Sequence, residues 1–248
     1  MITSVQNNKV KQWKKLKMKK ERQKQGVFLV EGFHLVEEAI KSQWNVQEVI
    51  VQQGVEVPDY VQDIEVHELT DNVFQAIAET KTPQGIAAVV GMKQHSWASF
   101  QRIVIVDSVQ DPGNLGTLIR TADAARFDGI VLGEGTVDVY NEKVVRATQG
   151  SLFHLPIFQA NLLEKIPELQ GEGFDVWAST LTGAVPYHTV AVPDKVALIL
   201  GNEGEGIAEA VIEQSDQLIK IPIYGQAESL NVSVASGILM YYVANHNQ

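Results

Sequence analysis

Residues 198–207 read Leu-Ile-Leu-Gly-Asn-Glu-Gly-Glu-Gly-Ile, an apolar strand that runs directly into three glycines spaced by polar residues. A tight turn needs only one or two glycines. Three glycines indicate that a flat or bulky ligand lies against the main chain, where no side chain intervenes. Because ligands of open α/β sheets bind beyond the carboxyl ends of the strands, this stretch predicts a binding site at a sheet edge.

Strand and helix candidates alternate around this loop through the second half of the chain. Short apolar runs predict strands at 103–106, 129–132, 174–178, 196–200 and 218–221. Other segments predict helices at 117–125, 142–148, 162–169, 207–214 and 230–244. Strands built almost entirely of Val, Ile and Leu are typical of a parallel sheet that is buried on both faces. We therefore predict a parallel α/β domain.

The first half shows a similar but weaker alternation. Strands are predicted at 27–30, 46–51, 64–66 and 86–90, with helices at 33–41 and 71–79 between them. In the segment before them, Val10, Trp13 and Leu16 have helical spacing. Residues 91–99 have no clear period and are interpreted as a linker. We expect two α/β domains, a small one at 1–94 and a larger one at 95–248.

A second unusual loop leads from a predicted strand into a helix. Residues 107–120 read Asp-Ser-Val-Gln-Asp-Pro-Gly-Asn-Leu-Gly-Thr-Leu-Ile-Arg. Asn114 and Thr117 are possible helix caps, and Arg120 falls one turn into the helix. The loop has neither the Gly-x-Gly-x-x-Gly dinucleotide pattern nor the Gly-Lys-Ser/Thr of a P-loop. Taken singly, it equally fits a capped turn with a surface arginine.

The third loop precedes a long apolar helix. Residues 221–233 read Ile-Pro-Ile-Tyr-Gly-Gln-Ala-Glu-Ser-Leu-Asn-Val-Ser. Ser229 is a plausible N-cap, which puts Asn231 and Ser233 in the first turn, where unpaired N–H groups attract acceptors and anions. Because Ser and Asn are common caps, a purely structural role explains each residue equally well.

The charge of the chain is unevenly distributed. The net charge is −10, but residues 1–25 carry nine Lys/Arg and one acid, Glu21, so this segment is +8 and the remainder is −18. A polyanion responds to charges within about one Debye length, roughly 8 Å at physiological salt. The segment therefore suits RNA phosphates, with Lys14, Lys15, Lys19 and Lys20 as candidate contacts, although a solvated helix carries such charge too.

Composition excludes several classes of protein. There is no cysteine, so disulfides, thiolate metal sites and cysteine nucleophiles are ruled out. No Asp/His cluster has metal-ligand spacing, and we expect no metal. The longest apolar runs are far too short to cross a bilayer, and the N-terminal lysines are followed by polar residues rather than by a signal-peptide core. We expect a soluble, cytoplasmic protein without membrane contact.

The three loops together resemble the motifs of the SpoU/TrmH family of RNA ribose 2′-O-methyltransferases, within the SPOUT superfamily. Residues 111–120 (D-P-G-N-L-G-T-L-I-R) resemble its first motif, 200–206 (L-G-N-E-G-E-G) its second, and 221–222 with 228–233 (E-S-L-N-V-S) its third. Their order and intervals also agree. The similarity extends over nearly the whole chain, through a connecting segment at 141–156 and a substrate-binding module that includes 28–32 and 82–86.

This resemblance implies a fold, a cofactor and partners. The larger domain would be a parallel α/β sheet threaded into a deep trefoil knot, a rare exception to unknotted chains. The small domain would be a ribosomal-protein-like RNA-binding module. The cofactor would be S-adenosylmethionine, and the partners an RNA and a second copy of the chain in a homodimer.

The resemblance also implies roles for individual residues. Main-chain groups of four residues would bind the cofactor: Thr180, Gly201, Ile221 and Leu230. Five residues match the catalytic centre: Asn114, Arg120, Glu203, Ser229 and Asn231. Arg146, in the connecting segment, matches a secondary position and would contact RNA. One departure is Thr148, where the family more often has serine, but the hydroxyl is kept.

Methyl transfer from a sulfonium is an in-line displacement, so the enzyme mainly has to align oxygen, methyl and sulfur. No histidine lies in the three motifs to serve as base. Arg120 is the family's candidate, but an arginine is nearly always protonated. Our hypothesis is that Arg120 binds the adjacent phosphate or stabilises the developing alkoxide, with proton loss assisted by a neighbouring group or by water.

Three alternatives remain open. The first is a nucleotide-binding oxidoreductase or hydrolase, against which the absent fingerprints argue. The second is a non-catalytic RNA-binding protein of the same fold, against which the intact Asn114, Arg120, Glu203 and Asn231 argue. The third is methylation of a base instead of a ribose. Ribosomal RNA is slightly favoured over transfer RNA, because a separate N-terminal module is predicted.

Overall fold

The computed structural model describes residues 1–246, which pack into two compact units. Unit 1 consists of Met1–Gln94 together with Asp138–His154, and unit 2 of His95–Val137 and the chain from Leu155 onwards. The division into functional domains at residue 94 stays a prediction. By packing, the segment Asp138–His154 belongs with unit 1.

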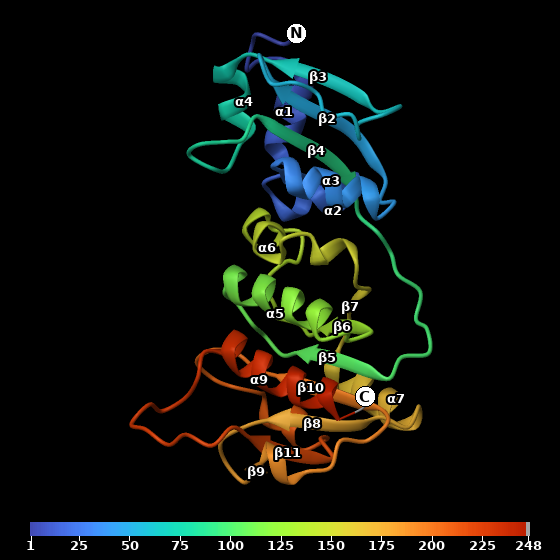
Figure 1. Cartoon of the computed structure of the whole chain (residues 1–248), viewed down its shortest axis with the longest axis vertical. Helices are drawn as coiled ribbons and strands as arrows, with labels where there is room; N and C mark the ends of the chain where they lie inside the picture. Colours follow the sequence, from blue (N-terminus) through green and yellow to red (C-terminus); the bar gives the residue numbers. More distant parts are fainter. Residues whose placement is uncertain (247–248) are drawn as a thin grey trace. The chain divides into compact units, whose positions relative to one another are not determined.

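Unit 1 contains a four-stranded sheet in the order β1-β4-β2-β3 (Figure 1). The strands are β1 (Val27–Glu31), β2 (Val46–Gln52), β3 (Glu65–Leu69) and β4 (Ile86–Gly91). β4 pairs antiparallel with β1 and β2, and β2 pairs parallel with β3. All four strands were predicted, with differences of one to three residues at their ends.

The basic segment forms two helices, α1 (Asn8–Lys15) and α2 (Lys19–Gln25), which ends at a left-handed Gly26. The other helices of unit 1 are α3 (Phe33–Lys41), α4 (Asp71–Ile77), α6 (Glu142–Thr148) and the 3-10 helix η1 (Ser151–Phe153). Val10, Trp13 and Leu16 are buried in one core with residues of α4, which confirms the predicted helical stripe. The lysines between them stay on the outer surface.

The segment Asp138–His154 packs on unit 1 through aromatic and charged contacts. Tyr140 lies 4.7 Å from Phe28, centroid to centroid, and Phe153 lies 5.2 Å from Trp44. Trp44 Nε1 also donates to the carbonyl of Phe153 at 3.1 Å. At the start of the segment, Asp138 forms an ion pair with the buried Arg22. Phe28 and Trp44 are both buried.

A carboxyl pair joins α6 to the loop after α4. Burial, a hydrogen bond to Glu79 and the charge of Glu79 raise the pKa of Glu142 to about 8. The hydrogen bond to Glu142 and the ammonium of Lys17, 3.0 Å away, hold the pKa of Glu79 below its usual range. Two carboxyl groups this close cannot both ionise readily, so the pair shares one proton near neutral pH.

This pair predicts a pH effect on stability. Folding raises the pKa of Glu142, so its contribution is fully present below the unfolded pKa and is lost as pH rises through about 8. Glu142→Gln keeps the neutral shape, and we expect its melting temperature to exceed that of the wild type increasingly from pH 6 to 9. Thermal unfolding across this range tests the effect, with exposed Glu56→Gln as control. Parallel curves for Glu142→Gln and the wild type would refute it.

Unit 2 contains a seven-stranded sheet in the order β7-β6-β5-β10-β8-β11-β9, in which every pairing is parallel, as predicted. The strands are β5 (Arg102–Val106), β6 (Gly129–Leu132), β7 (Ile157–Gln159), β8 (Asp175–Ser179), β9 (Val185–Pro186), β10 (Val196–Leu200) and β11 (Gln217–Lys220). β7 and β9 were not predicted, because two or three residues are too few for a recognisable period. The trefoil knot stays a prediction.

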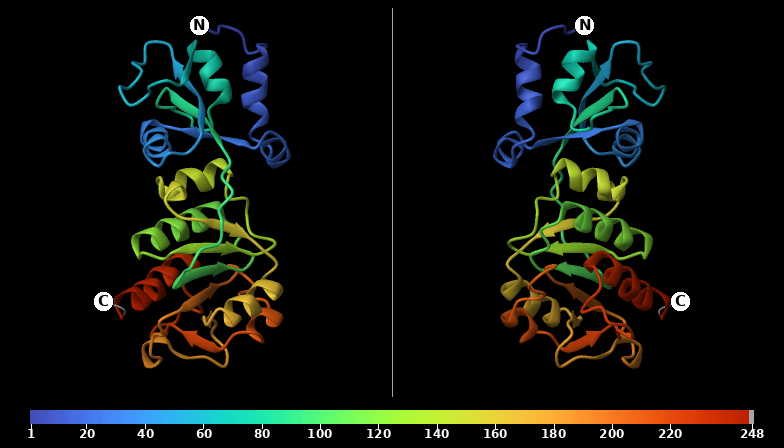
Figure 2. Two further views of the ribbon diagram at one scale, coloured as in Figure 1. Left: turned by 90° about the vertical axis from the view of Figure 1, so that its right-hand side faces the viewer. Right: turned by 90° about the vertical axis from the view of Figure 1, so that its left-hand side faces the viewer.

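Helices cover both faces of this sheet. They are α5 (Pro112–Ala124), α7 (Leu162–Gly171), α8 (Glu209–Ile212), α9 (Val232–Asn245) and the 3-10 helix η2 (Tyr187–Thr189). α5 and α9 lie side by side on one face, and α7 lies on the other (Figures 1 and 2). All five residues of β10 are buried at the centre of the sheet. The loop after β10 therefore emerges in the middle of the carboxyl edge.

Within residues 1–246, no helix combines the length and the apolar character that crossing a bilayer requires.

Candidate active site

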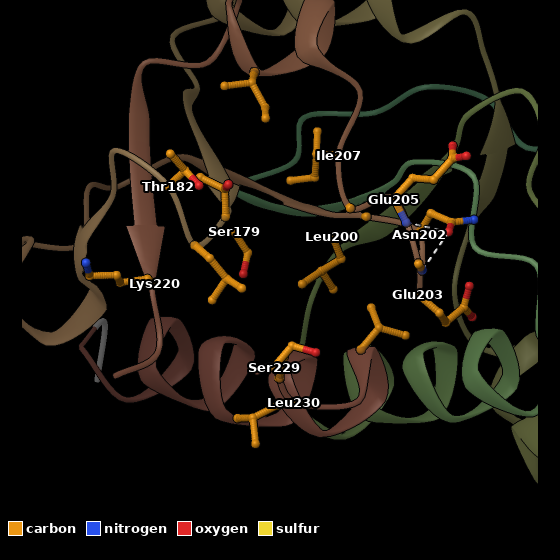
Figure 3. A pocket seen from close by; sticks show the side chains of 18 of the residues that line it. Ser179, Thr182, Leu200, Asn202, Glu203, Glu205, Ile207, Lys220, Ser229 and Leu230 are labelled. Carbon is orange, nitrogen blue, oxygen red and sulfur yellow. Dashed lines mark hydrogen bonds between the residues drawn. The ribbon is translucent and has the colours of Figure 1, made fainter. Parts of the chain in front are cut away.

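A cavity of about 770 Å³ lies at the carboxyl edge of the unit 2 sheet (Figure 3). Three stretches line most of it: 179–182 after β8, 200–209 after β10, and 220–235 between β11 and α9. These are the ends of neighbouring parallel strands, which explains why segments far apart in the sequence meet there. Binding pockets for small molecules usually have volumes of roughly 300–1,000 Å³. The predicted site at this edge therefore has room for a cofactor.

The loop after β10 is closed by main-chain and side-chain hydrogen bonds. Asn202 N donates to the carbonyl of Gly206 at 2.9 Å, and Gly206 N donates back to the carbonyl of Asn202 at 3.1 Å. The Asn202 side chain accepts from Gly204 N at 2.8 Å and donates to the carbonyl of Ser108 at 2.7 Å. Asn202 thus shapes the loop and ties it to the end of β5. No role for Asn202 was predicted from the sequence.

Gly201 is needed for a close approach of two main-chain segments. A Cβ at this position would lie 2.4 Å from the carbonyl carbon of Gly206 and 2.5 Å from the nitrogen of Ile207. Both are backbone atoms, which cannot swing away as a side chain can. Gly206 itself has φ +76°, in the left-handed region that favours glycine. Two of the three glycines are thus explained by the loop itself.

No role was predicted from the sequence for Asp107, the residue after β5, either. It is buried, and its Oδ2 accepts from Ala208 N at 2.8 Å. A buried carboxylate needs such partners. Asp107 and Asn202 together hold the glycine loop against the end of β5.

Helix α5 begins five residues before its predicted start. Asp111 is the N-cap, Pro112 occupies the first turn, and Asp111 Oδ1 accepts from Asn114 N at 2.8 Å. Proline suits this position because the N–H that it lacks would have no helical partner. Asn114 and Thr117 are therefore not caps, and the expectation of a later helix start is wrong. The Asn114 side chain is left available for other contacts.

Helix α9 is capped by Asn231, whose side-chain oxygen accepts from Ser233 N at 2.9 Å. The predicted cap, Ser229, is wrong, because the helix starts two residues later than expected. Asn in this position satisfies an N–H of the first turn.

The three motifs meet in a chain of side-chain hydrogen bonds. Asn114 Nδ2 donates to Glu203 Oε1 at 3.0 Å, and Asn231 Nδ2 donates to Asn114 Oδ1 at 3.1 Å. Because a carboxylate only accepts, Glu203 determines which end of the Asn114 amide faces it. The Asn114 oxygen is then directed towards Asn231. The chain connects the glycine loop, α5 and the start of α9.

Glu203 is held as a carboxylate. Burial raises its pKa, but hydrogen bonds from Asn114 and from the main-chain nitrogens of Gln110 and Asp111 outweigh burial and bring the pKa below its usual value. The two main-chain nitrogens lie 3.3 Å from its oxygens. Glu203 therefore acts here as an ionised acceptor that joins two loops.

Most predicted site residues gather at this cavity. Those that line it are Thr180, Gly201, Glu203, Ile221, Ser229 and Leu230. Asn114 and Asn231 join it through the hydrogen-bond chain. Arg120 does not line it: it is exposed on α5 and has no hydrogen bond or ion pair with the described part of the chain.

The predicted RNA-binding residues lie in unit 1. Lys14 and Lys15 are exposed on α1, and Lys19 and Lys20 on α2. Arg146 on α6 is half-buried, and its Nη1 is buried without a partner among residues 1–246. Its predicted contact with RNA stays a prediction.

One group of metal-ligating side chains occurs in unit 1: Glu48, Glu65 and His67. Lys9 Nζ lies among them, 2.9 Å from Glu48 Oε1 and 2.8 Å from His67 Nε2. The ammonium thus provides the positive charge there. Lys9 is engaged within the protein, unlike the four exposed lysines.

The fold and the site define a class: a parallel α/β protein with a cofactor-sized cavity at the carboxyl edge of its sheet, lined by a glycine loop that lacks the dinucleotide-binding pattern. Comparison with known proteins agrees. The family model described as SpoU rRNA Methylase matches residues 101–241, and an MRM3-like substrate binding domain matches residues 7–88. The chain belongs to the SpoU rRNA methylase family.

Individual relatives resemble the chain over its full length. The 23S rRNA (guanosine(2553)-2′-O)-methyltransferase RlmP of Bacillus subtilis (strain 168) is 48% identical over 243 residues, 98% of each chain. The crystal structure of an AdoMet-bound rRNA methyltransferase from Sinorhizobium meliloti has a TM-score of 0.91 and 32% identity, covering 99% of this chain and 97% of that one. A crystal structure of an RNA 2′-O ribose methyltransferase has a TM-score of 0.86 and 28% identity, covering 99% and 98%.

The protein is thus an RNA methyltransferase that uses S-adenosylmethionine, as predicted. The cavity fits this cofactor in chemistry as well as in size. It has apolar walls, including Ile221 and Ile223, and four glutamates against one lysine among its lining residues. This suits a molecule with an adenine ring and a positive sulfonium. When bound, the cofactor supplies a methyl group already activated for displacement.

Proposed function

We propose that the protein methylates the ribose 2′-hydroxyl of a guanosine in 23S ribosomal RNA. The observation that carries this proposal is the hydrogen-bond chain Glu203–Asn114–Asn231, which unites the three motifs beside the cavity. The substrate follows the 48% identical relative, and the match of residues 7–88 to a substrate-binding domain supports an RNA partner. We further propose that the protein works in the cytoplasm and uses no metal.

Each site residue has a proposed part in the reaction. Main-chain groups of Thr180, Gly201, Ile221 and Leu230 hold the cofactor. Asn114 and Asn231 orient the ribose, and Glu203 holds Asn114. Ser229 contacts cofactor or substrate from the loop before α9. Together they supply alignment, which contributes roughly 7–11 kcal/mol when reacting groups are well oriented.

Arg120 is proposed to bind the phosphate next to the target ribose or to stabilise the alkoxide as the proton leaves. Its fork of N–H donors suits phosphate oxygens. Arg120 is exposed on α5 and does not line the cavity, so its proposed contact with RNA lies at the surface of α5.

We also propose a homodimer. Val234 and Tyr241, both in α9, are 52% and 48% exposed, and Leu230 just before the helix is 37% exposed. Exposed apolar side chains on and next to one helix favour burial against another surface. Sedimentation equilibrium tests this, and a monomer at micromolar concentration would refute it.

The function is tested by incubating the protein with labelled S-adenosylmethionine and either 23S rRNA or bulk tRNA. We expect label in 23S rRNA, recovered as a nuclease-resistant dinucleotide that contains guanosine. Label in a released base would favour base methylation, and label in tRNA alone would overturn the choice of RNA. RNA binding without transfer would support a non-catalytic role.

The four exposed lysines give a separate prediction. Changing Lys14, Lys15, Lys19 and Lys20 to Gln removes up to four phosphate contacts, so RNA affinity at 0.15 M salt is expected to fall by up to roughly 100-fold. The slope of log affinity against log salt should drop by up to roughly 3. Filter binding at several salt concentrations measures both, and cofactor affinity serves as control. An unchanged slope would contradict this use of the segment.

A further inference from the structure

The rim of the cavity carries an excess of negative charge that the fold does not use. Four lining residues are acidic, Glu203, Glu205, Glu209 and Glu228, and one is basic, Lys220. The Glu203 carboxylate already accepts a hydrogen bond from Asn114. The other three are exposed and have no hydrogen bond or ion pair through their carboxylates with any described residue. Ion pairing therefore does not explain them, and only Glu209, in the first turn of the short helix α8, lies at a helix terminus.

The one lysine lies away from two of the four glutamates. Figure 3 shows Lys220 across the cavity from Glu203 and Glu205. RNA phosphates do not explain the charge either, because carboxylates repel them. The remaining candidate is the cofactor, whose charge changes during the reaction.

Methyl transfer removes one positive charge from the cofactor. The bond from sulfur to methyl breaks, its electron pair stays on sulfur, the methyl bonds to the ribose oxygen, and the hydroxyl proton passes to water. S-adenosylmethionine, with a positive sulfonium, becomes S-adenosylhomocysteine, with a neutral thioether. Apart from the methyl group, the two molecules have the same shape. A negative site therefore favours the substrate form over the product form.

We propose that Glu205, Glu209 and Glu228 select S-adenosylmethionine over S-adenosylhomocysteine by the charge of the sulfonium. This rests on the cofactor binding in this cavity. In water, one carboxylate at roughly 8 Å from a positive charge strengthens binding about two-fold. Three such carboxylates would strengthen the binding of S-adenosylmethionine about eight-fold at low salt. Exposed charges are screened over about 10 Å at 0.1 M salt, so the selection weakens as salt rises.

The test is equilibrium binding by calorimetry, without RNA, of S-adenosylmethionine, S-adenosylhomocysteine and sinefungin. Sinefungin carries a protonated amine where the cofactor has its methyl sulfonium. The triple variant Glu205→Gln, Glu209→Gln, Glu228→Gln is compared with the wild type in 20 mM and 300 mM KCl. The control for net charge is a second triple variant, Glu56→Gln, Glu68→Gln, Glu164→Gln, at exposed positions outside the cavity.

In 20 mM KCl the triple variant is expected to bind S-adenosylmethionine and sinefungin five- to ten-fold more weakly, with S-adenosylhomocysteine within two-fold of the wild type. The difference should shrink in 300 mM KCl. Equal weakening of all three ligands, or no change, overturns the selection. If the triple variant unfolds, the single variants decide, each with an expected change of about two-fold. Failure of the wild type to bind any of the three would instead count against the cofactor site itself.

Discussion

Replacing Gly201 with alanine is expected to reduce kcat/KM by about 100-fold or more. The added methyl would lie 2.4 Å from the Gly206 carbonyl carbon, so the main chain on one side of the loop must shift. This loop lines the cavity, and displacements of about 1 Å near a reacting centre can cost 100-fold. Calorimetric binding of S-adenosylmethionine should weaken in parallel, because the same loop is proposed to hold the cofactor.

The matched control is Gly171→Ala. Gly171 ends α7, and a Cβ there would have no heavy atom within 4 Å. Alanine also suits a helix better than glycine, so stability should stay level or rise slightly. If Gly201→Ala bound the cofactor as tightly as Gly171→Ala, the close approach would have no part in shaping the site.

Changing Asn114 to aspartate is expected to disrupt the hydrogen-bond chain and lower kcat/KM by at least about 100-fold at pH 8. The substitution keeps the shape but replaces the donor that faces Glu203, 3.0 Å away, with a second carboxylate. Two carboxylates at this distance repel until they share a proton. We therefore expect activity relative to the wild type to recover in part as pH falls to 6.

Asn141→Asp serves as control for the chemical change itself. Asn141 caps α6 by accepting from Lys143 N at 3.0 Å, and aspartate caps helices as well as asparagine does. Stability and activity should change little. Activity of Asn114→Asp that stayed low at every pH, with intact cofactor binding, would mean that the Asn114 amide acts on the ribose directly and that repulsion is secondary.

Much of the fold could be predicted from the composition of the strands and the spacing of the glycines. β10 was predicted with its observed ends, because five consecutive apolar residues between polar flanks allow little else. The ends of β6 and of helices α3 and α6 were also predicted as observed. Helix starts were less predictable. Asp111 and Ser229 both precede helical stretches, and only the folded chain distinguishes a cap from a loop residue.

The residue types of the site were readable from the sequence, and their motifs indicated the family. The contacts among them were not. Asn114 lies 89 positions from Glu203 and 117 positions from Asn231 in the chain, and no local pattern encodes such pairs. Asn202 and Asp107 were missed for the same reason, since each acts on main-chain groups that only the folded sheet brings near.

By itself, the sequence determined nine of the eleven strands within residues 1–246, the glycine loops and the basic character of residues 1–25, because these depend on composition and short-range spacing. Tertiary structure alone decided which amide end of Asn114 faces Glu203, that Arg120 stands apart from the cavity, and that Asp138–His154 packs with unit 1. The physical reason is that parallel strands bring their carboxyl ends together regardless of distance along the chain, and hydrogen-bond direction is set only once the partners meet.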